Sequence, residues 1–273
     1  LPTIAFALTI GLALLMTEMC MGRTSRGGAG TAFRKLGTPL TRFFGPVSVL
    51  TGALVLGFYS VVGGWCTHYL LASLTGNLAA DDPQALRAAF EAFAADPYEA
   101  AGCHVLFLSA TALVVLAGVQ KGIERVGKVL MPLLFILMLV LIGRGLTLPG
   151  AMEGVKFLFK PDWEAFTGEA LLNAMGFAFF SLSVGSGSMM NYGSYLSKDV
   201  NIGPATLWIV VLAVMASVLG GLMIMPAVFA FGLSPGAGPG LTFATMPAVF
   251  SHMPLGSFFA VLFFLSLFVA ALT

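Results

Sequence analysis

A cluster of small and polar residues interrupts an otherwise apolar stretch at 168–196. Its members are Ser181, Ser183, Gly185, Ser186, Gly187 and Ser188. Glycine weakens a helix by about 1 kcal/mol relative to alanine, so we expect a helix here to come apart near 181–187. An open backbone would offer carbonyl groups to a cation or an ammonium group, and a helix N-terminus to an anion. Close packing against a second helix is the alternative, because small residues serve that purpose too.

Glu18 is a carboxylate inside the apolar run at 2–22. A charge in lipid is expensive, so this side chain should face the protein interior and find hydrogen-bond donors there. It could support unpaired backbone N–H groups near the broken helix, or it could carry a proton. The alternative is that Glu18 lies close enough to Arg23 and the membrane interface to stay solvated.

Tyr59 lies in the middle of the apolar sequence LVLGFYSVVGGW. A buried phenol needs a partner for its hydroxyl group. That partner is either the carboxylate of a bound solute or a neighbouring backbone carbonyl, and the sequence alone favours the carbonyl.

Other chemistries find little support in the sequence. The three cysteines and three histidines share no spacing typical of a metal or redox site. They are Cys20, Cys66, Cys103, His68, His104 and His252. Nucleophile elbows, Walker loops and paired catalytic groups within one span are also absent, which argues against an enzyme. The net charge of +1 gives no basic field that would attract nucleic acid.

The composition predicts an all-α membrane protein. Of the 273 residues, 58% are hydrophobic and 9% are charged, whereas soluble domains carry roughly 25% charged residues. A hydrocarbon core about 30 Å thick requires about 20 apolar residues in a helix. Seven stretches qualify, and we expect them to form a single transmembrane domain over 1–273. They are 2–22, 44–75, 102–120, 127–149, 168–196, 203–232 and 255–273.

The charged residues of the loops predict the orientation. If the loop at 23–42 is cytoplasmic, nine basic residues lie inside and four outside, which agrees with the positive-inside rule. The inside residues are Arg23, Arg26, Arg34, Lys35, Arg42, Lys121, Arg125, Lys128 and Lys198, and the outside ones are Arg87, Arg144, Lys156 and Lys160. We therefore expect a multi-pass protein of the inner cell membrane, in contact with the lipid bilayer.

Two outside loops carry structure of their own. The 77–101 loop is long enough for a short helix bounded by Pro83 and Pro97. The 233–254 segment begins as a glycine-proline loop and continues as an amphipathic helix broken at Pro247, which could cap an external cavity or merely connect two spans. The chain starts and stops within apolar runs, so we expect a fragment that is incomplete at both ends.

Several long motifs resemble the neurotransmitter:sodium symporter family, especially its bacterial amino-acid transporters. The first span ends in Glu and Met-Gly-Arg as the second helix of that family does, and FYSVVGGW resembles the third helix. GIERVGKVLMPLLFILMLVLIGRGLTLPG resembles the fifth helix, and AFFSLSVGSGSMMNYGSYLSKD resembles the unwound sixth helix. GGLMIMPAVFAFG and the last 34 residues resemble the seventh helix, the external capping loop and the start of the eighth.

The resemblance implies a leucine-transporter-like bundle of two inverted five-helix repeats, of which this chain would hold helices two to eight. It implies secondary active transport, in which sodium influx drives uptake of an amino acid or a related small zwitterion. The first helix of the family, which supplies half of the substrate and sodium contacts, has no counterpart here. A homodimer is left open.

Site residues follow from the resemblance position by position. Tyr59 matches the tyrosine that holds the substrate carboxylate, and Phe180 matches the aromatic lid over the substrate. Phe180, Ser181 and Ser183 match positions whose backbone carbonyls bind the substrate amine. Val55 and Ser186 match positions of the side-chain pocket, and Ser186 is smaller and more polar than the phenylalanine often found there.

The implied sodium ligands and supports lie on the same spans. Ser181 matches a side-chain ligand of the first sodium ion. Ala270 and Thr273 match ligands of the second, through a carbonyl and a hydroxyl. Glu18 matches the carboxylate that braces the unwound helix, with Gly185 part of that support. The remaining match is Tyr195, which corresponds to a tyrosine of the cytoplasmic gate.

Three positions depart from the family. Phe177 stands where many members carry glutamine, and Leu212 and Ala216 stand where relatives carry an amide or an acid near the first sodium and the chloride. We therefore expect no chloride dependence. A non-transporting scaffold of the same fold and a passive channel are the alternatives, although a channel would need polar residues along a continuous path.

Overall fold

The chain is described by a computed structural model that is almost entirely helical in the parts it describes. These are residues 2–78, 83–118, 122–160, 163, 166–232, 235 and 241–272. Two compact units divide the chain. Unit 1 comprises Leu1–Gly57 and Lys160–Val218, and unit 2 comprises Phe58–Phe159 and Leu219–Thr273.

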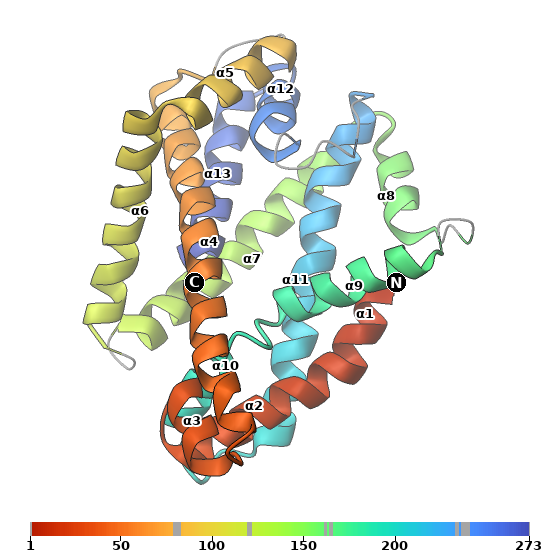
Figure 1. Cartoon of the computed structure of the whole chain (residues 1–273). Coiled ribbons are helices and arrows are strands. Elements are labelled where there is room, and N and C mark those ends of the chain that lie inside the picture. The colour runs from red at the N-terminus through yellow and green to blue at the C-terminus, as the bar shows by residue number, and fades with distance from the viewer. Residues whose placement is uncertain are drawn as a thin grey trace. The chain divides into compact units, whose positions relative to one another are not determined.

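The helical elements follow one another along the chain with short connections (Figure 1). In order they are α1 (Pro2–Phe6), the π-helical turn η1 (Ala7–Gly11), α2 (Leu12–Ser25), α3 (Ala29–Leu36), the 3₁₀ turn η2 (Thr41–Phe43), α4 (Phe44–Thr75), α5 (Pro83–Ala95), α6 (Pro97–Leu116), α7 (Glu124–Leu146), α8 (Ala151–Phe159), α9 (Gly168–Ser181), α10 (Ser188–Tyr195), α11 (Ile202–Ala230), the π-helical turn η4 (Leu241–Thr245), α12 (Met246–Ser251) and α13 (Gly256–Leu272).

In the described part of the chain, five helical segments are long and apolar enough to cross a membrane. They are Pro2–Ser25, Thr41–Thr75, Pro97–Leu116, Glu124–Leu146 and Ile202–Ala230. The apolar helix α13 is shorter, and the predicted span at 168–196 is divided into α9 and α10. The hydrophobic stretches thus form helices close to where the sequence predicted them.

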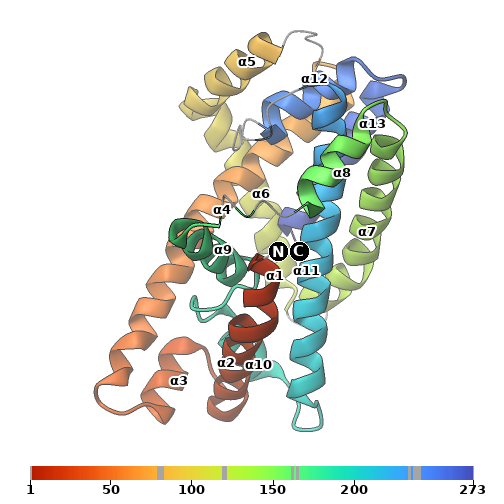
Figure 2. The same ribbon diagram turned by 90° about the vertical axis from the view of Figure 1, so that its right-hand side faces the viewer.

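Unit 1 is held together by a close crossing of α2 and α10 (Figure 2). A Cβ atom added at Gly22 would collide with the backbone of Met190, and one added at Gly193 would collide with the backbone of Met19. Glycine at both positions therefore lets the two helix backbones touch. This crossing fixes α10 against α2, the helix that carries Glu18.

Apolar side chains from α2, α9 and α11 form the core of unit 1. Leu15, Ala178 and Val210 are fully buried in it. Leu182 and Val184 belong to the same cluster, although they lie beyond the end of α9. The non-helical segment after α9 is therefore anchored by its apolar side chains.

Unit 2 contains an aromatic cluster that joins the short helix α5 to α4 and η4. Phe90 stacks on Phe243 with ring centroids 5.5 Å apart, and Trp65 packs edge-on against Phe90 at 5.1 Å. The predicted short helix between 77 and 101 is confirmed, because α5 begins at Pro83 and α6 begins at Pro97.

The segment after η4 differs from its prediction. We expected an amphipathic helix broken at Pro247. In the structure the π-helical turn η4 ends at Thr245 and α12 begins at Met246, so the change of helix type lies next to Pro247. Every residue from Met246 to Phe250 is buried, because α12 packs against both α13 and α5. The prediction of an amphipathic helix was wrong, whereas the change of helix type beside Pro247 agrees with the predicted break.

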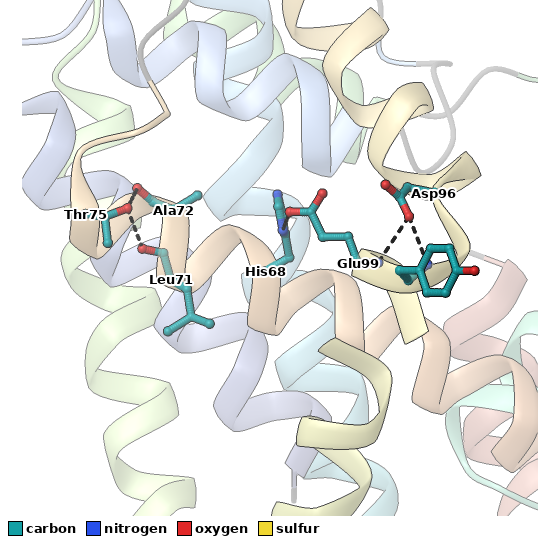
Figure 3. A network of polar contacts seen from close by, with 7 residues as sticks. His68, Leu71, Ala72, Thr75, Asp96 and Glu99 are labelled. Atoms are coloured by element: carbon teal, nitrogen blue, oxygen red, sulfur yellow. Dashed lines mark hydrogen bonds and ion pairs between the residues drawn. The ribbon is translucent and has the colours of Figure 1, made fainter. Parts of the chain in front are cut away.

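Polar contacts join α4 to α6 at one end of the two helices (Figure 3). His68 Nδ1 lies 3.2 Å from Glu99 Oε1, and the His68 ring stacks on Phe93 with centroids 3.8 Å apart. Asp96 caps α6 by accepting hydrogen bonds from the N–H groups of Tyr98 and Glu99. These contacts tie α4, α5 and α6 together within unit 2.

Candidate functional site

The helix α9 ends where the serine and glycine cluster begins. Ser183 N–H donates to the Phe180 carbonyl at 3.0 Å, and Val184 N–H donates to the Phe179 carbonyl at 3.1 Å. This pair of bonds is a Schellman motif, which usually places glycine at the left-handed position. Here Ser183 occupies that position with φ 54°. The predicted break in the helix is confirmed.

The chain then crosses to α10 without helical hydrogen bonding. Gly185 and Gly187 adopt φ values of 88° and 75°, which only glycine takes up readily. A Cβ atom at Gly187 would lie 2.6 Å from Cβ of Ala29, so this glycine also permits close contact with α3. The break is therefore built into the sequence by backbone geometry as well as by weak helix propensity.

Side chains alternate along the segment between α9 and α10. Leu182 and Val184 point into the core, whereas Ser181, Ser183 and Gly185 are exposed. This alternation resembles an extended chain, in which successive side chains face opposite sides. One side anchors the segment, and the other presents hydroxyl groups and main chain outward.

Glu18 stabilises the break from α2. Its Oε1 accepts a hydrogen bond from Gly185 N–H at 2.6 Å. In a continuous helix that N–H would donate to the Ser181 carbonyl, four residues earlier. Among the described residues no backbone N–H replaces it, so the Ser181 carbonyl keeps both of its lone pairs.

The second carboxylate oxygen of Glu18 stays without a protein partner. Glu18 is 7% exposed, and within the described ranges Oε2 has no hydrogen-bond partner. Burial of this degree argues against the alternative that Glu18 remains solvated beside Arg23. An unpaired buried carboxylate oxygen is costly, so Oε2 requires a donor that the described residues do not provide.

Hydroxyl groups line the end of the break next to α10. Ser186 Oγ donates to the Ser183 carbonyl at 3.1 Å and lies 2.9 Å from Ser188 Oγ. The Ser183 carbonyl therefore accepts one hydrogen bond already and retains one lone pair. The sequence did not single out Ser188 as a site residue, although it belongs to the same serine cluster.

The other candidate residues of unit 1 lie on helices around the break. Phe180 is 52% exposed in the last turn of α9, and Val55 is half-buried on α4. A Cβ atom at Gly52, one turn before Val55, would meet the Ser186 carbonyl at 3.5 Å. Tyr195 ends α10 and is exposed. The structure thus brings α4 and the break together near Ser186.

Two candidate residues belong to unit 2 and contact each other. Tyr59 OH donates to the Ala270 carbonyl at 3.4 Å, which joins α4 to α13. The partner of the phenol is thus a backbone carbonyl, as the sequence favoured. Thr273, the other predicted ligand of the second sodium ion, lies outside the described residues.

The donor atoms around the break suit an alkali cation or an ammonium group better than a transition metal. Across the described ranges no group of three histidine, cysteine or acidic side chains could hold a metal ion. What the break offers is oxygen: the Ser181 carbonyl, the Ser183 carbonyl and the hydroxyls of Ser181 and Ser183. Hard cations take oxygen ligands of this kind.

Comparison with known proteins identifies the family. The profile of the Sodium:neurotransmitter symporter family matches residues 1–94 and 97–273. The chain belongs to this family. The uncharacterized sodium-dependent transporter YhdH of Bacillus subtilis is 41% identical to this chain. The match covers 99% of this chain and 60% of YhdH. An uncharacterized sodium-dependent transporter of Haemophilus influenzae is 35% identical over 97% of this chain and 61% of its own length.

A solved structure of the family has the same fold. The crystal structure of MhsT in complex with L-phenylalanine superimposes with a TM-score of 0.91 at 40% sequence identity. The match covers 99% of this symporter-family chain and 62% of MhsT. The predicted leucine-transporter-like fold with a broken helix is confirmed. The chain spans about 60% of the length of each of these three relatives.

Two arginines of the symporter-family chain contribute to the site without having been predicted. Arg23 Nη1 donates to the Val200 carbonyl at 2.7 Å, and Arg26 Nη1 donates to the Leu196 carbonyl at 2.7 Å. Both bonds hold the chain just beyond α10 against the end of α2. Their position in a basic loop indicated orientation only, because carbonyl partners from a distant segment leave no pattern in the local sequence.

Proposed function

We propose that the protein containing this chain couples sodium influx to the uptake of an amino acid or a related small zwitterion. The observation that carries the proposal is the broken helix, in which Glu18 takes the Gly185 N–H and leaves the Ser181 carbonyl open. Membership of a sodium symporter family supports it. The bound L-phenylalanine of MhsT, a 40% identical relative, supports an amino acid as substrate.

The open backbone of the break would bind the substrate ammonium group and a first sodium ion. Exposed carbonyls of Phe180, Ser181 and Ser183 would accept hydrogen bonds from the substrate ammonium group, because each retains at least one lone pair. The Ser181 hydroxyl would be a ligand of a first sodium ion. Phe180, exposed at the end of α9, would cover the substrate, and Val55 and Ser186 would contact its side chain.

The candidate residues of unit 2 would bind the substrate carboxylate and a second sodium ion. Tyr59 OH would exchange its 3.4 Å bond to the Ala270 carbonyl for one to the substrate carboxylate. The Ala270 carbonyl and the Thr273 hydroxyl would be ligands of a second sodium ion. Tyr195 would contribute to a gate on the cytoplasmic side. We propose that both units belong to one transmembrane domain in the inner cell membrane, with 23–42 in the cytoplasm.

Coupling would arise because ion and solute use the same stretch of open backbone. A bound sodium ion would order the carbonyls that the ammonium group also needs. By thermodynamic linkage, sodium must then raise the affinity for the solute as much as the solute raises the affinity for sodium. No step in this scheme makes or breaks a covalent bond.

The test is binding of radiolabelled amino acids to the purified full-length protein, with sodium or potassium as the cation. We expect saturable binding in sodium and little in potassium. Equal binding in both salts would reject sodium coupling. Absence of binding for every amino acid in sodium, by a protein that is folded by circular dichroism, would instead favour a scaffold.

A further inference from the structure

The segment between α2 and α4 is strongly basic. It carries Arg23, Arg26, Arg34, Lys35 and Arg42, and no acidic residue occurs between Glu18 and Asp81. These cations therefore find no carboxylate nearby in the sequence. Their side chains divide into two groups by what they contact.

Three of the cations are used to fold the segment onto unit 1. Arg23 and Arg26 donate to carbonyls beyond α10, and Lys35 Nζ donates to the Ser25 carbonyl at 2.9 Å. In these bonds all three charged groups donate to carbonyls of the protein itself. They are therefore engaged within unit 1.

Arg34 and Arg42 form the second group. Both side chains are exposed, and neither makes an ion pair or hydrogen bond within the part of the chain that the structure describes. Each guanidinium group offers five N–H donors in a planar fork that fits two oxygens of a phosphate. These two free guanidinium groups lie eight residues apart, on α3 and η2, which contact each other.

Large apolar side chains flank Arg42 in the sequence. Leu40 is 84% exposed and Phe43 is 70% exposed. The segment Thr41–Thr75, which is long and apolar enough to cross a membrane, begins among them. Exposed apolar residues next to arginines are typical of segments that lie in the membrane interface.

We propose that the face formed by Arg34, Leu40, Arg42 and Phe43 binds anionic phospholipid. The two guanidinium groups would contact the phosphates of the headgroups, while the apolar side chains enter the acyl-chain boundary. Charge complementarity selects anionic lipid, because no acidic side chain accompanies the arginines. The apolar residues select a lipid rather than a soluble phosphate compound.

The opposite side of α3 packs against the broken helix. Ala29 and Ala32 are buried with Met190 of α10, and Ala29 fills the space left by Gly187 at the end of the break. A lipid that holds α3 in place from outside therefore also supports the start of α10. Anionic lipid should stabilise this region whether or not the protein transports anything, so the inference does not depend on the proposed function.

The test uses the full-length protein, delipidated in a neutral detergent and titrated with phosphatidylglycerol or phosphatidylcholine. Bound lipid is counted by native mass spectrometry, and thermal stability is followed in parallel. We expect phosphatidylglycerol to bind and to raise Tm more than phosphatidylcholine does. In the double variant Arg34→Gln with Arg42→Gln, affinity for phosphatidylglycerol should fall about 30-fold, from about 1 kcal/mol for each basic side chain near an anionic surface.

Two further variants and two salt conditions sharpen the result. Replacing both arginines by lysine should restore most of the affinity. The matched double variant Lys156→Gln with Lys160→Gln removes two exposed cations that the sequence assigns to the other side of the membrane, and it should bind as the wild type does. Added sodium chloride should weaken binding. Equal lipid binding by the Arg34 and Arg42 variant and the wild type would overturn the proposal. So would equal stabilisation by inorganic phosphate, which would assign the face to a soluble anion.

Discussion

The Gly185 amide donates to Glu18 Oε1 across 2.6 Å, although the two residues are 167 positions apart in the sequence. This bond replaces the helical bond that would have linked Gly185 to Ser181. One side chain on α2 therefore satisfies a backbone N–H group that the break in the helix leaves without its helical acceptor. The relationship leads to predictions that separate the stability of the break from the binding of solutes.

Replacing Glu18 by leucine should destabilise the protein. The Gly185 N–H would lose its acceptor in a buried position, which costs about 1–3 kcal/mol. Glu18→Gln keeps an acceptor oxygen and should cost less. Thermal unfolding in detergent measures both variants, with Cys20→Ala, exposed two residues further along α2, as the control. Equal Tm values for Glu18→Leu and the wild type would show that the bond contributes nothing.

Alanine at the two left-handed glycines should have unequal effects. Gly185→Ala places a Cβ in open space, so its cost is the strain of a positive φ, about 1–2 kcal/mol. Gly187→Ala has the same strain and in addition meets Ala29 Cβ at 2.6 Å, which adds roughly 1–3 kcal/mol of overpacking. The free energy of unfolding should therefore be lower for Gly187→Ala than for Gly185→Ala. The reverse order would mean that α3 does not pack against the break as described.

The crossing of α2 and α10 should not tolerate a methyl group. In Gly22→Ala the new Cβ would collide with the backbone of Met190, and backbone cannot move aside as a side chain can. We expect the Gly22→Ala variant to have a lower Tm than the wild type and to give a poor yield of folded protein. Gly30→Ala is the control, because a Cβ there meets nothing within 4 Å and should gain about 0.5–1 kcal/mol of helix stability in α3.

Removing the Tyr59 hydroxyl should show whether this group binds substrate or only stabilises the fold. If the phenol binds the substrate carboxylate, Tyr59→Phe should weaken amino-acid binding about 10- to 100-fold, because a hydrogen bond to a charged group contributes about 1.5–3 kcal/mol. Tyr98→Phe, at a tyrosine that is 88% exposed, should bind normally. A Tyr59→Phe protein with a lowered Tm and unchanged affinity would limit the hydroxyl to its bond with Ala270.

Much of this arrangement could be predicted from the sequence, because it depends on local composition. Long apolar runs require helices in a membrane, and the serine and glycine cluster after Phe180 weakens a helix at one place. Glu18 could be expected to find backbone donors, since a carboxylate in an apolar span needs them. Each of these inferences depends only on residues that are close together in the sequence.

Other features depend on packing between distant segments and left no local pattern. The burial of α12 follows from its contacts with α13 and α5, whereas the sequence predicted an amphipathic helix with an exposed face. Ser183 in a left-handed conformation could not be foreseen, because serine has no preference for it. The bond from Tyr59 to Ala270 joins residues 211 positions apart.

The Schellman motif after α9 has a consequence for how a solute would be received. The bonds to the Phe179 and Phe180 carbonyls, together with the bond from Gly185 to Glu18, stabilise the break through contacts within the protein. An arriving molecule need not melt a helix first, and little ordering entropy is lost on its capture. Discrimination among molecules would then rest on the shape and polarity of their side chains, with the common backbone groups of all amino acids held equally well.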